Sequence, residues 1–234
     1  MDRDGLQDFK GLNIEQKQEL LQLLLRKHRL LMPDKMRAFM KPCRYKFAYG
    51  GRGGGKSESA QKLALYRGNE EKTRAMFVRE IQNSIADSVH SSLKDLITQL
   101  DYTGYVANDR NIINSNTSTN FIFKGMYQEA KKQTVKSYAN IDLCIVEEAQ
   151  SISKETIDLL VPTIRKDNSE IWFLFNRLFP DDPVFRFMQS LPHDQKIVVN
   201  INYNDNPFLP KPLIDAAELS KQRYEEGISD DYLH

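Results

Sequence analysis

The sequence predicts an α/β domain of the doubly wound type, with helices on both faces of a mostly parallel sheet. Three observations predict it. Short apolar segments alternate along most of the chain with longer segments whose apolar residues recur at helical spacing. A glycine cluster directly follows the first apolar segment at residues 45–49. Residues 141–146 are nearly all apolar, as expected of a central strand that is buried on both faces.

The elements follow from these patterns. Strands are expected at residues 45–49, 75–78, 141–146, 171–175 and 197–201, and β-hairpins at residues 105–124. Helices are expected from Asn13 to Pro33, after the glycine cluster, at residues 85–100, after the capping residue Ser153, and from Pro212 toward Gly227. Ligands of such a sheet bind at the carboxyl ends of its strands, so the functional residues are expected there.

Composition excludes several classes of protein. The chain has 234 residues, of which 40% are hydrophobic and 28% charged, and its 33 basic and 32 acidic residues leave a formal net charge of +1. We expect a soluble globular protein in which any nucleic-acid contact comes from a local patch. Neither a run of about 18 apolar residues nor a secretory signal is present, so we expect no membrane partner. Two distant cysteines and four scattered histidines favour neither a disulfide framework nor a zinc site.

The glycine cluster fits the phosphate-binding pattern G-x-x-x-x-G-K-[S/T] at every fixed position. It comprises Gly50, Gly51, Arg52, Gly53, Gly54, Gly55, Lys56 and Ser57. Glycines let several backbone N–H groups approach one phosphate, and the next helix adds partial positive charge. Lys56 is expected to reach the β- and γ-phosphates of ATP, and the Ser57 hydroxyl to bind Mg²⁺. The alternative is a flexible glycine turn.

Arg52 is an unusual residue inside such a loop. Its charge could reach the γ-phosphate and stabilise the transition state, as an arginine finger does. It could equally pair with a neighbouring carboxylate, and the sequence leaves both interpretations open.

Two acids, Glu147 and Glu148, end the apolar run at residues 141–146. One carboxylate cannot both associate with Mg²⁺ and take a proton, so two adjacent acids allow a division of labour. Glu147 is expected to act on the metal side, and Glu148 to polarise the attacking water as general base. Two acids on a solvated loop are the alternative interpretation.

Asn176 follows the strand expected at residues 171–175, where its amide could bond to the γ-phosphate or the water and sense hydrolysis. Arg177 beside it could contribute charge in its own subunit or to a neighbour. A strand-ending asparagine turn is the alternative.

Several stretches resemble the large subunit of tailed-bacteriophage terminases, the DNA-packaging motor. They are residues 49–57 (YGGRGGGKS), 79–89 (REIQNSIADSV), 141–150 (IDLCIVEEAQ), 169–176 (SEIWFLFN) and 202–207 (NYNDNP). The resemblance runs from about residue 45 to the end of the chain. The arginine-bearing loop together with residues 79–89 makes it fairly specific.

The resemblance implies a P-loop NTPase core of the additional-strand class, with a β-hairpin insertion and a small helical C-terminal lid. It implies an ATPase that drives double-stranded DNA through the portal protein into a preformed capsid. The motor would work as a ring of five subunits, with a small terminase subunit recruiting the DNA, in the cytoplasm of the infected bacterial host. Glu147 would be the metal-associated acid, Glu148 the catalytic acid and Asn176 part of the coupling motif.

Two departures from the family pattern bear on these expectations. Members often have Asn-Pro after the coupling strand, whereas Asn176-Arg177 stands here, which leaves the coupling geometry open. Full-length members continue into a nuclease domain that would begin near residue 234. We therefore expect a helical extension at residues 1–43, an ATPase core at 44–205 and the start of a lid or linker at 206–234, without nuclease activity.

A cluster of lysines precedes the acidic strand and comprises Lys124, Lys131, Lys132 and Lys136. These side chains could contact DNA phosphates without reading sequence, although a charge run is usually a solvated face.

Two other functions compete with a packaging motor. A two-lobed helicase needs a second ATPase-like domain, for which 234 residues leave no room. An ATP-binding switch or scaffold without turnover would not need a well-placed base such as Glu148.

Overall fold

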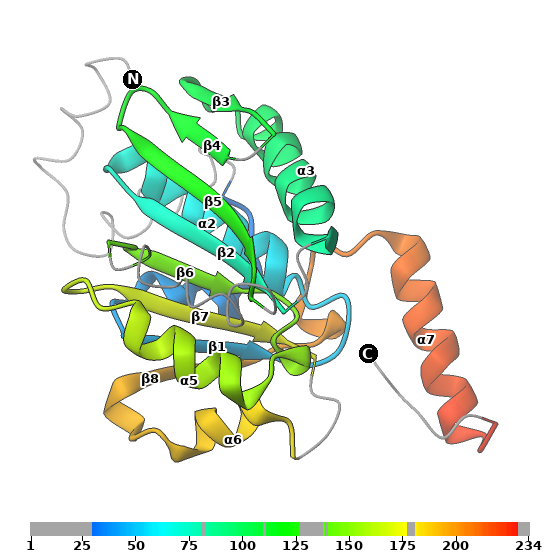
Figure 1. The fold of residues 1–234 in the computed structure, drawn as a ribbon. Coiled ribbons are helices and arrows are strands. Elements are labelled where there is room, and N and C mark those ends of the chain that lie inside the picture. Colours follow the sequence, from blue (N-terminus) through cyan, green and yellow to red (C-terminus); the bar gives the residue numbers. More distant parts are fainter. Residues whose placement is uncertain are drawn as a thin grey trace, which may run out of the picture. The chain divides into compact units, whose positions relative to one another are not determined.

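An eight-stranded sheet forms the centre of the fold, in the order β3-β4-β5-β2-β6-β7-β1-β8 (Figure 1). The computed structural model describes residues 30–80, 83–109, 111–126, 138, 140–176 and 181–228. The chain divides into two units, Met1–Leu31 and Met32–His234, and the second contains the sheet. The helix expected from Asn13 lies outside the described residues.

The strands largely match the expected ranges. They are β1 (Tyr45–Tyr49), β2 (Arg74–Arg79), β3 (Tyr105–Ala107), β4 (Asn111–Asn114), β5 (Thr119–Gly125), β6 (Leu143–Val146), β7 (Glu170–Phe175) and β8 (Lys196–Asn200). β3, β4 and β5 form the expected hairpins, but β5 also pairs in parallel with β2 and so belongs to the main sheet. β6 begins two residues later than expected, and Asp142 just before it accepts a hydrogen bond from the Arg74 backbone N–H with its carboxylate.

β7 lies between the strand that enters the glycine cluster, β1, and the strand that ends in the acidic pair, β6. All residues of β6 and β7 are buried, which explains why their sequences are apolar except for Glu170 at the start of β7. The parallel pairing also extends from β6 through β2 to β5, and from β1 to β8. An additional strand between β1 and β6 is the arrangement that the sequence resemblance implies.

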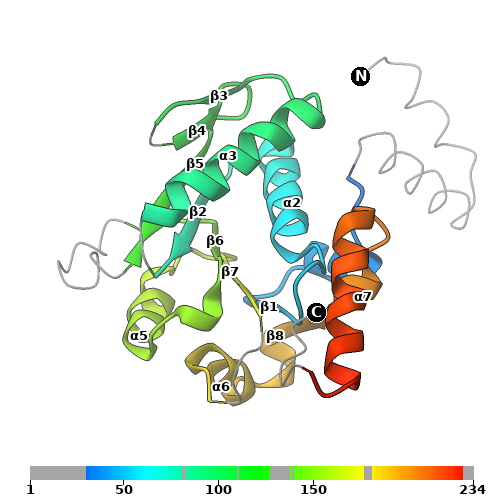
Figure 2. The same ribbon diagram turned by 90° about the vertical axis from the view of Figure 1, so that its right-hand side faces the viewer.

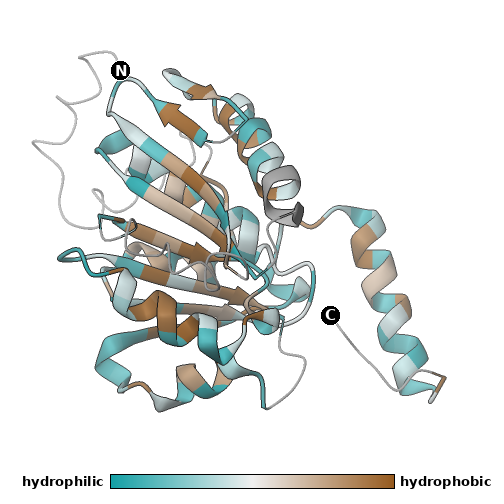
Figure 3. Ribbon diagram, viewed as in Figure 1, coloured by the Kyte–Doolittle hydropathy of each residue, from teal (hydrophilic) through white to brown (hydrophobic). Residues whose placement is uncertain are grey.

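Helices cover both faces of the sheet, as expected of a doubly wound fold (Figure 2). The described α-helices are α2 (Lys56–Glu70), α3 (Asn83–Gln99), α5 (Lys154–Thr163), α6 (Pro183–Ser190) and α7 (Lys211–Glu225). α2 and α3 pack on one face. On the other face, α5 and α6 bury apolar side chains against β1, β6 and β7 in one core cluster. Figure 3 shows hydrophobic residues concentrated in the central strands.

Within the described residues, four short 3-10 helices connect these elements: η2 (Asp34–Met40), η4 (Ala149–Ser151), η5 (His193–Gln195) and η6 (Tyr203–Asp205). η2 packs against α2 and β8 and buries Met36 and Phe39. α7 buries only Ala217 and exposes Leu213, Leu219 and Tyr224. Among the helices that the structure describes, none combines the length and apolar character needed to cross a membrane.

Candidate nucleotide-binding site

The glycine cluster forms a loop between β1 and α2 at the carboxyl edge of the sheet (Figure 1). Three of its glycines have positive φ: Gly50 at 144°, Gly53 at 78° and Gly55 at 74°. Gly55 is also the N-terminal cap of α2. A side chain would strain the backbone at these positions, so the loop conformation itself requires glycine.

A second reason for glycine comes from the other side of the loop. A Cβ atom at Gly50 would lie 2.1 Å from the carbonyl oxygen of Ile201, and one at Gly54 would lie 2.8 Å from the same atom. The chain leaving β8 therefore lies directly against the loop. The sequence pattern predicts glycines for phosphate binding but not this close backbone contact.

Lys56, at the start of α2, is the buried cation of the loop. Its Nζ donates hydrogen bonds to the carbonyl oxygen of Gly51 at 2.6 Å and to that of Gly50 at 3.3 Å. Burial lowers the pKa of Lys56 to about 8, although the nearby Glu147 carboxylate acts in the opposite direction. Lys56 is therefore held inside the loop by carbonyl oxygens and poised to accept an anionic ligand.

Ser57 and Glu147 meet at the carboxyl ends of β1 and β6. The Ser57 hydroxyl donates to Glu147 Oε2 at 2.6 Å, and only 2% of Glu147 is exposed. Burial raises the pKa of Glu147, while the Ser57 hydrogen bond and the Arg79 charge lower it. Its second oxygen, Oε1, is buried without a hydrogen-bond partner among the described residues. A hydroxyl and an unsatisfied carboxylate oxygen side by side are a donor set that fits Mg²⁺.

Glu148 lies beside this pair in a different environment. Its side chain is 56% exposed, and its Oε1 lies 3.2 Å from Nη2 of Arg79, at the end of β2. Glu148 has φ 51° and ψ 43°, a left-handed conformation that is unusual for a residue other than glycine. Residues 147 and 148 are adjacent in sequence, but one carboxylate is buried next to Ser57 while the other reaches solvent.

Arg52 and Asn176 line the same cavity, which has a volume of about 270 Å³ and also includes residues 53–58. The Asn176 backbone N–H donates to Gln150 Oε1 at 3.2 Å. Arg52 is exposed and makes no ion pair with any carboxylate in the described part of the chain. Arg52 of the loop and Asn176 at the end of β7 therefore line one cavity.

Most of the other candidate residues fall outside the part of the chain that the structure describes. Arg177, Lys131, Lys132 and Lys136 lie outside the described residues. Lys124 lies on β5, where its Nζ is 5.9 Å from the centre of the Tyr138 ring. The lysine cluster therefore stays a prediction.

Site residues that the sequence motifs do not single out lie on the segment after β8. Asn202 Oδ1 accepts a hydrogen bond from the Gly51 N–H at 2.7 Å, and Asn206 Nδ2 donates to the Gly53 carbonyl at 2.8 Å. Arg79 is likewise absent from the predicted site. The only sequence signal for these residues was that they fall within stretches resembling the terminase family.

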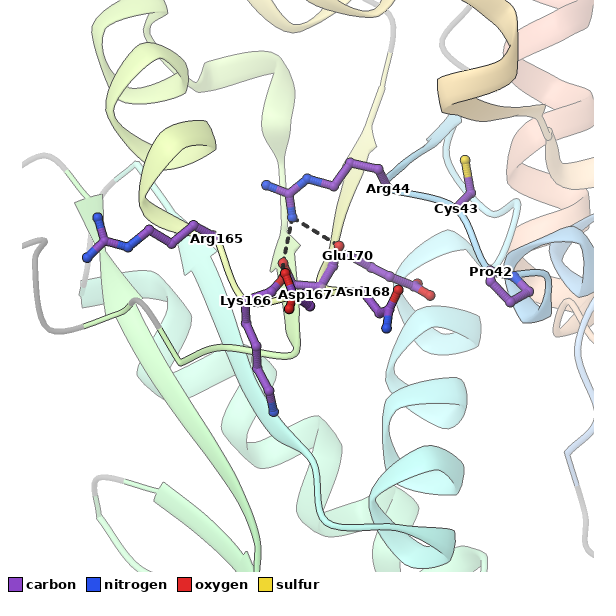
Figure 4. Close-up of a pocket in the computed structure, with 9 residues that line it drawn as sticks. Pro42, Cys43, Arg44, Arg165, Lys166, Asp167, Asn168 and Glu170 are labelled. Atoms are coloured by element: carbon purple, nitrogen blue, oxygen red, sulfur yellow. Dashed lines mark hydrogen bonds between the residues drawn. The ribbon is translucent and has the colours of Figure 1, made fainter.

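Two larger cavities lie at the opposite, amino-terminal edge of the strands. One, of about 590 Å³, is lined by residues 42–44 and 165–170 (Figure 4). The Arg44 Nη1 atom there donates to the backbone oxygen and the hydroxyl of Ser169, at 2.9 and 2.7 Å. Its Nη2 atom donates to the carbonyl oxygens of Val161 and Ile164. The guanidinium is thus used to hold the end of α5 and the following loop.

The sheet order and the loop together define a P-loop NTPase fold of the additional-strand class, with loop, acids and Asn176 at one edge. A model of the family described as "Phage terminase large subunit" matches residues 43–229, which is most of the chain. The chain therefore belongs to the phage terminase large subunit family.

Individual relatives agree with this assignment. The PBSX phage terminase large subunit of Bacillus subtilis (strain 168) is 27% identical over 202 residues, which cover 76% of this chain and 46% of the relative. The large terminase of a thermophilic bacteriophage has a TM-score of 0.66 at 12% identity, over 81% of this chain and 50% of that one. That terminase has also been solved with ADP and with ATP-gamma-S.

The N-terminal domain of the bacteriophage phi29 DNA packaging ATPase has a TM-score of 0.57 at 17% identity, over 75% of this chain and 97% of that domain. The likeness to the solved structures concerns the fold. The chain spans about half the length of the curated relative and of the thermophilic phage terminase.

Proposed function

We propose that this chain is the ATP-hydrolysing motor domain of a phage terminase large subunit, and that it powers movement of double-stranded DNA into a procapsid. The observation that carries the proposal is the Ser57–Glu147 pair, with its unsatisfied buried oxygen, beside Lys56 of the glycine loop. Membership of the terminase family supports the same function. A glycine turn without ligands would not need to bury a carboxylate and an amine next to each other.

The loop would bind the nucleotide through its charge and its backbone. The triphosphate would draw Lys56 Nζ away from the Gly50 and Gly51 carbonyls, and the backbone N–H groups at the start of α2 would contact the phosphates. Ser57 and Glu147 would hold Mg²⁺, which neutralises charge on the phosphate oxygens when bound. Arg52 lines the cavity next to Ser57 and would add positive charge to the γ-phosphate.

Glu148 is the better candidate for the general base. Its carboxylate is exposed enough to meet a water molecule, and its ion pair with Arg79 favours one orientation. Glu147, by contrast, is buried and bonded to Ser57, which suits metal association. Asn176 would contact the γ-phosphate or the attacking water from the end of β7.

The partners follow from the family. Double-stranded DNA is the proposed cargo, and the portal protein, a small terminase subunit and further copies of the chain in a ring are the proposed partners. The chain would act in the cytoplasm of the infected host. A solved phi29 viral genome packaging motor assembly, which resembles this chain with a TM-score of 0.56, supports work within an assembly.

The test is Mg²⁺-dependent phosphate release by the wild-type chain, Glu148→Gln and Lys56→Ala, alongside binding of a fluorescent ATP analogue. We expect Glu148→Gln to bind the analogue but to lower kcat by roughly 10²-fold or more, because it removes the base. Lys56→Ala should lose both binding and turnover.

The kind of nucleic acid that stimulates ATP hydrolysis distinguishes between the competing functions. Stimulation by duplex DNA supports a packaging motor, and stimulation by single strands alone would indicate a helicase-like motor. Nucleotide binding with equal lack of turnover in all three proteins would contradict the proposed catalytic role in this chain.

A further inference from the structure

The two asparagine contacts to the glycine loop fall on either side of Arg52. Asn202 binds the backbone N–H of Gly51, the residue before Arg52. Asn206 binds the backbone carbonyl of Gly53, the residue after it. We refer to Asn202 and Asn206 as the asparagine brace.

The brace is itself fixed by further hydrogen bonds. The Asn202 backbone N–H donates to Asp205 Oδ2 at 3.0 Å, which forms a capping box around η6. The same carboxylate oxygen accepts from Lys35 Nζ at 2.8 Å, which ties η6 to η2. Asn206 Oδ1 accepts from the Phe208 N–H at 3.1 Å, so its amide nitrogen faces the Gly53 carbonyl. The brace is therefore anchored independently of the loop.

We propose that the asparagine brace positions Arg52 for its action on the γ-phosphate, an inference that rests on the proposed function. A loop with three positive-φ glycines has wide conformational freedom, and an exposed arginine within it would sample many directions. Fixing the backbone on both sides of Arg52 restricts where its guanidinium can reach. The contact between Ile201 and the glycines at 50 and 54 holds the base of the loop in the same way.

The brace residues act through Arg52 rather than on the nucleotide. Neither asparagine lines the cavity that Arg52, Lys56, Ser57 and Asn176 share. Asn202 Oδ1 and Asn206 Nδ2 bind backbone atoms of the loop. Asn202 and Asn206 are thus positioning residues, and their loss should affect the transition state more than nucleotide binding.

The chain offers a matched control inside the same segment. Asn204 lies between the two brace residues, is exposed, and has no hydrogen bond to another described residue. Asn204→Ala should therefore behave as wild type where Asn202→Ala and Asn206→Ala do not.

Two measurements test the brace. In amide hydrogen exchange without nucleotide, Asn202→Ala and Asn206→Ala should speed exchange in peptides covering residues 50–57 by roughly fivefold, the worth of one hydrogen bond. Asn202→Asp keeps the acceptor oxygen and should retain protection. Asn206→Asp replaces the donor and should behave as Asn206→Ala.

In steady-state kinetics, both alanine variants should lower kcat by roughly fivefold and change ADP affinity by less than about twofold. In an Arg52→Ala background they should cause no further loss of kcat, because the brace acts through that residue. The inference is overturned if the kcat losses of the brace variants multiply with the loss caused by Arg52→Ala. It is also overturned if amide exchange at residues 50–57 is unchanged in the brace variants.

Failure of the proposed function gives a different result. A wild-type chain that binds ATP without hydrolysing it contradicts the motor alone. In that case the brace is tested by comparing the affinity of each variant for ADP with aluminium fluoride, a transition-state analogue, with its affinity for ADP alone. Asn202→Ala and Asn206→Ala should weaken binding of this analogue more than binding of ADP alone. Equal effects on the affinity for both ligands would overturn the inference.

Discussion

Burial brings Lys56 into the range where its amine loses its proton at mildly alkaline pH. Its pKa of about 8 lies well below the ordinary value for lysine, because desolvation outweighs the attraction of Glu147. A bound triphosphate would favour the charged form. Nucleotide binding should therefore select the protonated amine.

This selection predicts a pH dependence of affinity. Because the fraction of charged Lys56 in the free protein falls as pH rises through 8, affinity for ATP should fall by about tenfold between pH 7 and pH 9. Lys56→Arg stays charged throughout and should bind with a flatter pH profile. Fluorescent-nucleotide titrations across this range check the slope, and a parallel decline in both proteins would assign it to another group.

Some residues of the site could be predicted from a short stretch of sequence, and others could not. Positions 50–57 and the acids Glu147 and Glu148 could be predicted because a short motif, or the end of one apolar strand, identifies them. Arg79, Asn202 and Asn206 could not, since their partners are distant in sequence and meet them only through sheet pairing. Likewise, nothing local indicates that Glu148 is exposed while Glu147 is buried.

At the scale of elements, the N-terminus of α5 is closed by a side-chain cap. Ser153 Oγ accepts from the Thr156 N–H at 3.2 Å, the cap that the sequence predicts. The carboxylate of Glu80, just beyond β2, accepts from the hydroxyls of Ser153 and Thr156 at 3.0 and 3.2 Å. The cap therefore also joins α5 to β2, which ends in the Arg79 that pairs with Glu148.

Removing this cap should destabilise the fold. We expect Ser153→Ala to lower the free energy of unfolding by about 1–2 kcal/mol, since the helix loses its cap and Glu80 loses a donor. The matched control is Ser91→Ala at an exposed position inside α3, where alanine should stabilise slightly. Urea unfolding of the three proteins measures both effects, and equal midpoints for the two variants would contradict the capping role.

The elements that sequence reasoning missed are those with weak periodicity. α6 has only eight residues, and η2 is a 3-10 helix, so neither gives the repeated spacing that predicts a long helix. Asp182-Pro183 was the available signal for α6, because proline favours the first turn of a helix. The strands of the central sheet were easier to predict, because burial on both faces makes their sequences mostly apolar.

At the scale of the whole molecule, a buried ion pair holds together the edge of the sheet opposite the nucleotide site. Lys46 Nζ, on β1, lies 2.7 Å from Glu170 Oε2 on β7 and donates to the Phe39 carbonyl of η2 at 2.6 Å. The same Glu170 oxygen accepts from Trp172 Nε1 at 2.7 Å, and Arg67 of α2 lies 3.8 Å from Glu170 Oε1. Four elements thus share one charged cluster.

Breaking this buried ion pair should lower the free energy of unfolding more than breaking an exposed pair. Lys46→Met leaves the Glu170 carboxylate buried without its cation, and we expect a loss of about 3–5 kcal/mol in the free energy of unfolding. Lys46→Met combined with Glu170→Leu should recover much of that loss, because no lone charge remains. The exposed pair of Lys221 with Glu225 supplies the control, where Lys221→Met should change stability by under about 0.5 kcal/mol. Denaturant titrations that give additive losses for the double variant would contradict the coupling.

The place of β1 in the sheet has a consequence for biosynthesis. β1 pairs only with β7 and β8 among the described strands, and both are translated long after it. On the ribosome, the β1 segment therefore lacks its neighbours, and is exposed to chaperones and to misassociation, until the segments of β7 and β8 have emerged. The glycine loop can close only once Asn202 and Asn206 have been made. The nascent protein thus becomes able to bind ATP only after the segment that follows β8 has emerged, and not when its signature motif first appears.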